Sequence, residues 1–335
     1  MTGETRQLGE IVARLGQRRV LVIGDVMLDE YVWGRVSRVS PEAPVPVVEV
    51  TRESWYPGGA ANVARNLKEF AGAVHLLGLT GADAEAERLR QLLAEEGVGI
   101  ECLGRDPGRR TTVKTRIIAR QQQVVRVDRE AKLPPTPAQA AQALECFGRV
   151  LPEVDAVIIA DYAKGFVDQH FADRVRQAAM RAGKIVTVDP SPKNPLAWAG
   201  VTAVKPNRAE AFEFAGMPYS DPAGDPAEDR ALLEAGGILL ANWRPSTVLI
   251  TLGEQGMLLL EEGAPPYHTP TRAKEVFDVS GAGDTALAVF TLGLAAGATP
   301  AEAAELANRA SGIAVGKLGT ATATAAELQA AFAQL

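Results

Sequence analysis

The chain has 335 residues, of which 47% are hydrophobic and 5% aromatic, and its formal net charge is −6. This length suits one large α/β domain with an accessory piece, and the core should be built mainly from Ala, Val, Leu and Ile. The acidic balance argues against a nucleic-acid-binding protein, because no large basic excess is available to neutralise phosphates.

The thiols and the N-terminus indicate a reducing, aqueous compartment. The N-terminal segment lacks the apolar core of a secretory signal, and no apolar run is long enough to predict a membrane span. Cys102 and Cys146 are the only cysteines and form no C-x-x-C pair. We therefore expect no disulfide framework, no structural zinc site, no membrane partner and a cytoplasmic location.

Short apolar runs bounded by Gly, Pro, Asp or Asn recur along the chain. They predict buried strands at 18–25, 73–81, 154–161, 184–190, 201–207 and 246–253. Helical patterns at 83–97, 136–151 and 299–316 lie between them, the last two opening with a Thr-Pro capping-box sequence. This alternation predicts a Rossmann-like α/β fold with a doubly wound, mostly parallel sheet flanked by helices.

Two segments break this rhythm. Residues 31–59 and 109–130 alternate polar and apolar side chains, and the first contains several prolines. Both predict exposed antiparallel strands. We interpret them as a small β-sheet lid, formed by about 31–57 and 109–128 and inserted in a single domain that spans 1–335.

Polar residues follow the ends of several predicted strands. Ligands collect at the carboxyl ends of strands in an open α/β sheet, so these residues are candidates for a binding site. They are Asp25, Asp29, Asp161, Lys164, Asp189, Lys193, Asn207, Glu210, Thr251 and Gly253.

The stretch DVSGAGDTALAVF, residues 278–290, places small residues and an acid at the start of a helical run. A helix start offers unpaired N–H groups and the positive end of the dipole, so it suits an anion. Gly281, Ala282 and Gly283 would let the backbone approach a phosphoryl group, while Asp284 took a proton from a hydroxyl. The alternative is a glycine-rich helix cap, although a cap needs no run of small residues.

Neither of two common phosphate motifs is present. The chain lacks G-x-x-x-x-G-K-[ST], and GAGDTA lacks the last glycine of G-x-G-x-x-G. A P-loop enzyme and a nicotinamide dehydrogenase are therefore disfavoured.

The stretch PGGAANVARN, residues 57–66, is a second glycine-rich entry to a helix. Gly58 and Gly59 allow close backbone approach, and Asn62 can offer a donor and an acceptor to a sugar hydroxyl. The alternative is a simple turn before a helix. Asp25 and Asp29 have two interpretations as well, since they could hold sugar hydroxyls or satisfy loop amides.

The pair Asn207 and Glu210 also has two interpretations. The two residues could lie at a magnesium-bound phosphate, or they could form a capping box at a helix start.

Basic residues in the second lid segment form another candidate group. Lys114, Arg116, Arg120 and Arg126 are spaced to share one face of a strand, which would concentrate positive charge over whatever the lid covers. The alternative is a solvated face. With Lys164 and Lys193, they are the candidate ligands of a substrate phosphate.

PGGAANVARN and DVSGAGDT resemble the two signature motifs of the PfkB, or ribokinase-like, sugar kinase family, and the likeness runs from about residue 18 to 330. Finer detail resembles one subgroup, the kinases of D-glycero-D-manno-heptose 7-phosphate. SPEAPVPV is the most telling stretch, alongside RQQQVVRVDRE, DYAKG, QGMLLL and VGKLGTAT.

The resemblance implies roles for the matching residues. Asp284 would be the catalytic base, and the N–H groups of Gly281, Ala282 and Gly283 the anion hole. ATP and Mg²⁺ would lie near Asn207, Glu210, Thr251, Gly253, Gly256 and Asn308, with Glu210 at the metal. The sugar phosphate would contact Asp25, Asp29, Gly58, Gly59, Asn62, Asp161 and the six basic residues above. A monovalent cation near Asp278 and Ser280 is a further candidate.

The resemblance further implies phosphorylation of O1 of heptose 7-phosphate, which feeds nucleotide-heptose synthesis for lipopolysaccharide or another surface glycan. A homodimer through the lid is expected. The sequence contains no H-x-G-H motif, so we expect a separate nucleotidyltransferase to act on the product. Two rival hypotheses are a kinase of another sugar or nucleoside, such as ribose, fructose or a ketodeoxy acid, and a non-catalytic sugar- or nucleotide-binding regulator.

Overall fold

The computed structural model describes residues 3–119, 122–273, 276, 279–317 and 321–333. Its main sheet has nine strands in the order β13-β12-β11-β10-β9-β8-β1-β4-β5. In chain order they are β1 (Arg19–Gly24), β4 (Ala73–Thr80), β5 (Gly99–Arg105), β8 (Ala156–Ala160), β9 (Ile185–Asp189), β10 (Ala203–Val204), β11 (Thr247–Thr251), β12 (Met257–Glu261) and β13 (Tyr267–Thr269).

The main sheet is parallel from β11 to β5, whereas β12 and β13 pair antiparallel at one edge. The predicted Rossmann-like, mostly parallel sheet is therefore confirmed. The predicted strand 201–207 is much shorter than expected, because only Ala203 and Val204 pair with both neighbouring strands. After them Pro206, which has no N–H, precedes the start of a helix.

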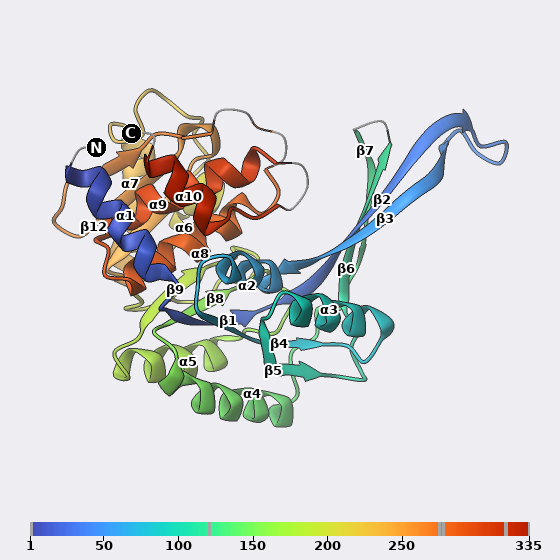
Figure 1. The fold of residues 1–335 in the computed structure, drawn as a ribbon, viewed down its shortest axis with the longest axis horizontal. Helices are drawn as coiled ribbons and strands as arrows, with labels where there is room; N and C mark the ends of the chain where they lie inside the picture. Colours follow the sequence, from blue (N-terminus) through green and yellow to red (C-terminus); the bar gives the residue numbers. More distant parts are fainter. Residues whose placement is uncertain (1–2, 120–121, 274–275, 277–278, 318–320, 334–335) are drawn as a thin grey trace.

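Helices cover both faces of the main sheet (Figure 1). They are α1 (Gly3–Leu15), α2 (Ala60–Lys68), α3 (Ala84–Glu95), α4 (Pro137–Val150), α5 (Gln169–Arg181), α6 (Arg208–Ala215), α7 (Arg230–Trp243), α8 (Ala282–Ala295), α9 (Pro300–Val315) and α10 (Ala325–Ala333). Alternate residues of β1 enter two separate cores. Val20 and Val22 pack with α1, α2 and α8, whereas Leu21 and Ile23 pack with α4, α5 and α7. Burial on both faces explains the continuous apolar runs.

The three predicted helices are present with the expected starts. Thr136 and Thr299 each form a capping box, with Gln139 and Glu302 respectively, and a proline follows each threonine. The Asp83 side chain accepts a hydrogen bond from the N–H of Ala86 and so caps α3. The local sequence therefore determines where these helices begin.

A second sheet of four strands, in the order β3-β2-β6-β7, projects from the body as the expected lid (Figure 1). Its strands are β2 (Val26–Val39), β3 (Pro46–Gly59), β6 (Thr112–Ala119) and β7 (Gln122–Arg129). The outer pairs are antiparallel as predicted, but the central pair β2–β6 is parallel, which corrects the all-antiparallel expectation. The reason is that β2 and β6 follow β1 and β5, which run in the same direction in the main sheet.

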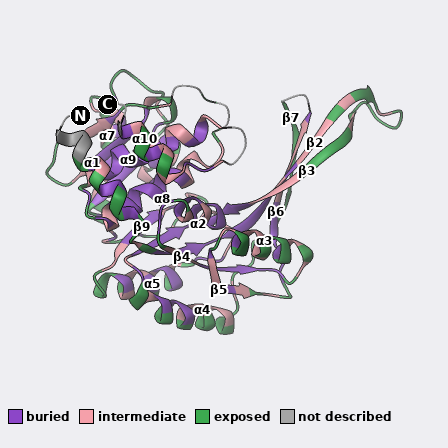
Figure 2. Ribbon diagram, viewed as in Figure 1, coloured by how far each residue is buried: buried purple, intermediate pink, exposed green. Residues whose placement is uncertain are grey.

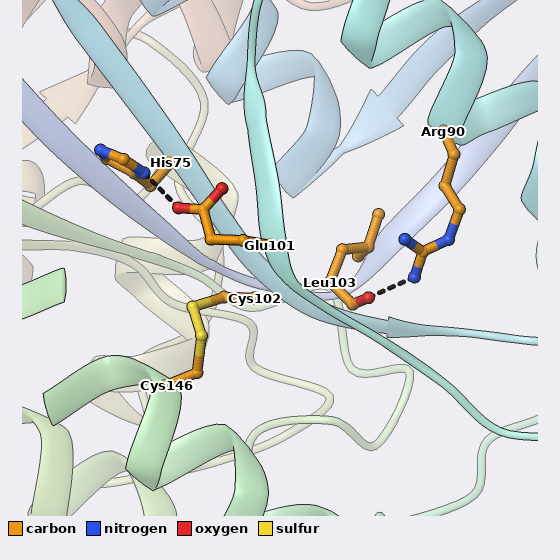
Figure 3. Close-up of a disulfide and its surroundings, with 6 residues drawn as sticks. All are labelled: His75, Arg90, Glu101, Cys102, Leu103 and Cys146. Atoms are coloured by element: carbon orange, nitrogen blue, oxygen red, sulfur yellow. Dashed lines mark hydrogen bonds and ion pairs between the residues drawn. A yellow bond between two sulfur atoms is a disulfide. The ribbon is translucent and has the colours of Figure 1, made fainter. Parts of the chain in front are cut away.

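The cysteine prediction was wrong. Cys102 in β5 and Cys146 in α4 form a disulfide with a Cα–Cα distance of 5.7 Å (Figure 3). The two residues are 44 positions apart, so no local spacing pattern indicates the pair. They meet because α4 packs against the β4–β5 edge of the sheet. The cysteines therefore no longer support the expected reducing compartment.

Within the described residues, no helix is long and apolar enough to cross a membrane.

Candidate active site

The start of α8 is an uncapped helix N-terminus. Gly281 is its N-cap residue, with φ 82°, and no side chain caps the described first turn. A Cβ at Gly281 would lie 2.9 Å from Asn62 Nδ2, so both conformation and space require glycine. Gly281 therefore forms the N-cap through its backbone, as the capping alternative predicted, although no side chain caps the described first turn. The N–H of Ala282 donates to the Val279 carbonyl oxygen at 3.2 Å, so an anion here would rely on the rest of the turn and on the positive end of the helix dipole.

Asp284, in the first turn of α8, has a hydrogen-bond donor at each carboxylate oxygen. The Tyr162 hydroxyl donates to Oδ1 at 2.6 Å, and Asn62 Nδ2 donates to Oδ2 at 2.6 Å. Burial raises the pKa of Asp284, and these two donors together with Lys205 oppose that rise. Asn62 Oδ1 is buried with no hydrogen-bond partner among the described residues, which leaves it available to a ligand.

A buried lysine that the sequence analysis did not single out lies beside this turn. Lys205 is 4% exposed, and its Nζ lies 3.1 Å from Asp189 Oδ1. The same nitrogen lies 3.5 Å from the position that a Cβ would take on Gly283. Burial disfavours the charged amine, but Asp189 and Glu210 outweigh it and raise the pKa of Lys205. Its position after a short strand, before Pro206, is the only sequence signal for it.

Desolvation raises the pKa of Asp189 to about 7, although Lys205 opposes the rise. Asp189, Lys205 and Asp284 thus form one electrostatically coupled group at the end of the sheet, in which Lys205 is buried and both aspartates are half-buried. Tyr162 is a second residue of this group that no sequence pattern indicates, although it lies within the DYAKG motif.

A cavity of about 850 Å³ opens in front of α8. It is lined by all six candidate nucleotide residues, Asn207, Glu210, Thr251, Gly253, Gly256 and Asn308. Ala282, Gly283 and Lys205 line it too, so the cavity reaches the uncapped turn. Its other wall is apolar and includes Val279, Val315, Ala286 and Met257. An apolar wall with a few polar groups is typical of a small-ligand site.

Asn207 and Glu210 form a reciprocal capping box at the start of α6, as the second interpretation predicted. Both also line the cavity, so the two interpretations are compatible. Asn308 Nδ2 donates to the carbonyl oxygens of Thr269 and Pro270, and so fixes the segment that follows β13. Gly256 has φ 89°, and a Cβ there would collide with the same segment.

Asp25 satisfies loop amides, as one of its two interpretations predicted. It is 3% exposed and accepts hydrogen bonds from the N–H groups of Tyr162, Lys164 and Phe166. Asp161, also buried, accepts from Asn194 Nδ2 and from the N–H of Ala163. Both carboxylates therefore shape the segment between β8 and α5.

The lid adds charged groups near the glycines of the first motif. Asp29 Oδ1 lies 2.6 Å from Arg116 Nη1, and a Cβ on Gly58 would collide with the Asp29 carboxylate. Gly59 has φ 58° and is the N-cap residue of α2. The close approach of β2 and β3 at this point explains the paired glycines.

The cationic candidates occupy different places. Strand register pairs Arg116 with Arg126 and Lys114 with Asp128, so these residues lie on two strands rather than one. Lys164 Nζ pairs with Glu130 at 2.5 Å, and Lys193 is exposed. Arg120 and Asp278 lie outside the described residues.

The described residues contain no cluster of three His, Cys, Asp or Glu side chains that could hold a metal ion.

Solved structures share this fold. Ribokinase of Arabidopsis thaliana, complexed with ribose and ATP, matches with a TM-score of 0.74 and 18% identity, over 94% of this chain and 98% of its own. Phosphofructokinase-2 of Escherichia coli, in complex with substrates and products, matches with a TM-score of 0.77 and 21% identity, over 95% and 99% of the two chains. The fold is therefore ribokinase-like.

The pfkB family carbohydrate kinase model matches residues 17–327. The chain belongs to this family. It is 46% identical to the bifunctional protein HldE of Caulobacter vibrioides, over 93% of this chain and 63% of the relative. It is 42% identical to the bifunctional protein HldE of Desulfatibacillum aliphaticivorans, over 93% of this chain and 62% of the relative. The chain thus spans a little under two-thirds of these relatives.

Proposed function

We propose that the chain is an ATP-dependent sugar kinase that phosphorylates O1 of D-glycero-D-manno-heptose 7-phosphate to the 1,7-bisphosphate. The observation that carries the proposal is the position of Asp284, held by two donors at the mouth of an uncapped helix that faces a cavity of about 850 Å³. The family membership and the motifs shared with heptose 7-phosphate kinases support the sugar phosphate as acceptor. Nucleotide-heptose synthesis for a surface glycan would consume the product.

The reaction follows from this arrangement. Asp284 takes the proton of the sugar O1 hydroxyl as that oxygen bonds to the γ-phosphorus, and the bond from the γ-phosphorus to the ADP oxygen breaks. The N–H groups of Gly281 and Gly283 would hold the transferring oxygens, whereas that of Ala282 donates to the Val279 carbonyl oxygen. Lys205 would supply positive charge beside them. Catalysis is then mainly positioning and charge stabilisation, as for phosphoryl transfer generally.

Mg²⁺ would arrive with ATP near Glu210. A single carboxylate fits this ion, because Mg²⁺ keeps several water and phosphate ligands in such sites. The ion would neutralise charge on the β- and γ-phosphates. A monovalent cation beside Ser280 stays a prediction, since its other proposed ligand, Asp278, lies outside the described residues.

The sugar 7-phosphate would bind the cationic groups of the lid. Lys114 is electrostatically coupled to Lys164 and Arg126. Arg116 lies opposite Arg126 in the register of β6 and β7. This proximity of four cationic side chains supports a shared anion site. Asp29, Asn62 and the paired glycines would then face the sugar ring. Lys193 and Arg120 stay candidates for the same phosphate.

A homodimer through the lid is part of the proposal. The lid carries six of the exposed large hydrophobic side chains of the described residues, Val39, Val45, Val50, Val124, Val125 and Val127. Figure 2 shows the projecting strands largely exposed or intermediate, with little cover from the body. A second copy of the lid would bury these valines. We also propose a cytoplasmic location, where ATP and sugar phosphates are available.

The test is ADP release, coupled to an optical assay, across a panel of free and phosphorylated sugars. We expect heptose 7-phosphate to give the highest kcat/KM and unphosphorylated heptose to be a poor substrate. A preference for free ribose or fructose would contradict heptose 7-phosphate as the acceptor and would support only the more general activity of a sugar kinase. ATP binding without turnover on any sugar would favour the regulator hypothesis.

The base is tested separately with Asp284→Asn, which keeps the shape of the side chain. General base catalysis typically contributes about 10²–10⁴-fold, so kcat should fall by that factor while ATP binding persists. Turnover near the wild-type rate would exclude Asp284 as the base.

A further inference from the structure

The Asp284 carboxylate is fixed by groups from two distant parts of the chain. Asn62, in α2, donates to Oδ2, and Tyr162, in the segment between β8 and α5, donates to Oδ1, both at 2.6 Å. With one donor at each oxygen, rotation of the carboxylate would break both hydrogen bonds. The two glycine-rich motifs account for Asn62 and Asp284, but no role has been assigned to Tyr162 or to its hydrogen bond to Oδ1.

The segment that carries Tyr162 is itself held rigidly. Asp25, at the end of β1, accepts hydrogen bonds from the N–H groups of Tyr162, Lys164 and Phe166. Between them, Ala163 has a φ of 55°, a conformation that costs energy for a residue other than glycine. Such a turn persists only where its surroundings determine it. The Tyr162 hydroxyl is therefore held in place by the backbone beneath it.

We propose that Tyr162 is a positioning residue for phosphoryl transfer: its hydroxyl holds the Asp284 carboxylate toward the acceptor hydroxyl and stabilises its ionised form. The inference rests on the proposed role of Asp284 as general base. Tyr162 need not contact the sugar or the nucleotide. Its effect passes through the hydrogen bond to Oδ1.

The charges around Asp284 determine the sign of the effect. Burial raises the pKa of Asp284, Tyr162 and Asn62 lower it by hydrogen bonding, Lys205 of the β10–α6 connection lowers it, and Asp29 of β2 raises it. Asp189 of β9 is electrostatically coupled to Asp284 as well. Burial also raises the pKa of Tyr162 well above its usual value, so its hydroxyl stays a donor at every assay pH. Removing that donor should raise the pKa of Asp284.

The experiment is the pH profile of kcat/KM for Tyr162→Phe, measured with the sugar that the wild type phosphorylates best. Hydrogen bonds to charged groups are worth enough to move a pKa by about one unit. We expect the acid limb of the profile to move about one unit to higher pH, so that activity below the limb falls about tenfold. KM for ATP should stay unchanged, because the aromatic ring and the backbone contacts to Asp25 remain.

Tyr267→Phe is the matched control, since it also removes a tyrosine hydroxyl that donates to a carboxylate, here Glu305 at 3.1 Å. Its acid limb should coincide with that of the wild type. An unmoved limb for Tyr162→Phe, or a change in sugar KM alone, would overturn the positioning role.

Asp284→Asn separates the two hypotheses. If that variant stays active, the proposed base is wrong. If it is inactive and Tyr162→Phe retains the wild-type profile, the inference alone is wrong. Use of the best sugar, whichever it is, keeps the test independent of the heptose assignment.

Discussion

Lys205 Nζ lies 3.1 Å from Asp189 Oδ1, and this ion pair of a buried lysine and a half-buried aspartate lies beside the first turn of α8. A buried lysine is costly unless a partner or ligand needs its charge. Asp189 offsets only part of that charge, because its own pKa is raised to about 7. Lys205 and the positive end of the α8 dipole would then both attract a phosphoryl group.

Lys205→Met should lower kcat by roughly 10²–10³-fold, the usual cost of removing one electrostatic donor from a transition-state site. The variant should stay folded, because methionine fills similar space. Without the lysine, the pKa of Asp189, already about 7, would rise further, so that acid would be neutral and would not leave an unpaired charge. Steady-state kinetics measure the effect. Lys132→Met, at an exposed lysine, is the control. A kcat within threefold of wild type would refute the role.

Gly283→Val should abolish turnover without unfolding the protein. Gly283 lines the cavity, and a Cβ there would make only ordinary contact with Lys205, so the fold can accept a side chain that blocks the phosphoryl group. Circular dichroism and ADP release measure the two properties. Gly237→Val, on the exposed face of α7, should remain active. An unfolded Gly283→Val protein would indicate a structural need for glycine.

Lys114→Ala should raise KM for the sugar phosphate about tenfold to a hundredfold and leave KM for ATP nearly unchanged. Burial lowers the pKa of Lys114 and Asp29 raises it, while Lys164 and Arg126 lower it. A bound phosphate would relieve this repulsion, and a charge-assisted hydrogen bond is worth roughly 1.5–3 kcal/mol. Lys132→Ala is the control. Equal effects on both KM values would place Lys114 outside the phosphate site.

Asp161→Asn should change how stability depends on pH. Desolvation raises the pKa of Asp161 to about 7, although hydrogen bonds from the backbone N–H of Ala163 and the side-chain amide of Asn194 oppose the rise. In the folded state Asp161 therefore keeps its proton up to a higher pH than in the unfolded chain, where the pKa of an aspartate is about 3.9. The contribution of Asp161 to the free energy of unfolding is therefore largest below about pH 4 and is lost as the pH rises from about 4 to 7.

Asparagine cannot ionise, so this fall should be shallower in the variant, with a gain above pH 7 of at most roughly 4 kcal/mol. Urea denaturation at several pH values measures it. Identical slopes for the two proteins would show that Asp161 keeps an ordinary pKa.

The disulfide should be detectable and stabilising. Without reductant, the unfolded chain should show no reactive thiol, and after reduction it should show two. Closing a loop between Cys102 and Cys146, which are 44 positions apart, corresponds to at most about 4 kcal/mol in the chain-entropy model. Cys102→Ser should therefore lower Tm under oxidising conditions and match the reduced wild type. Two free thiols in the oxidised protein would contradict the pairing.

The sequence by itself determined the elements whose causes are local. Thr136 and Thr299 define helix starts through capping boxes, and the apolar runs of β1 and β8 predict strands buried on both faces. The position of Gly281 and Asp284 at a helix start could also be predicted, because small residues and an acid directly precede a long apolar run. These features depend on residues within one turn or strand of each other.

Only the tertiary structure decided the features that join distant segments. Tyr162 and Asn62 meet at Asp284, from 122 and 222 positions away, and no spacing rule can indicate such contacts. Cys102 meets Cys146 because a helix packs on a sheet edge, and β2 pairs parallel to β6 because both follow parallel strands. The folded chain likewise determines the charge of Lys205, because it places Asp189 and Glu210 near the amine and excludes solvent from it.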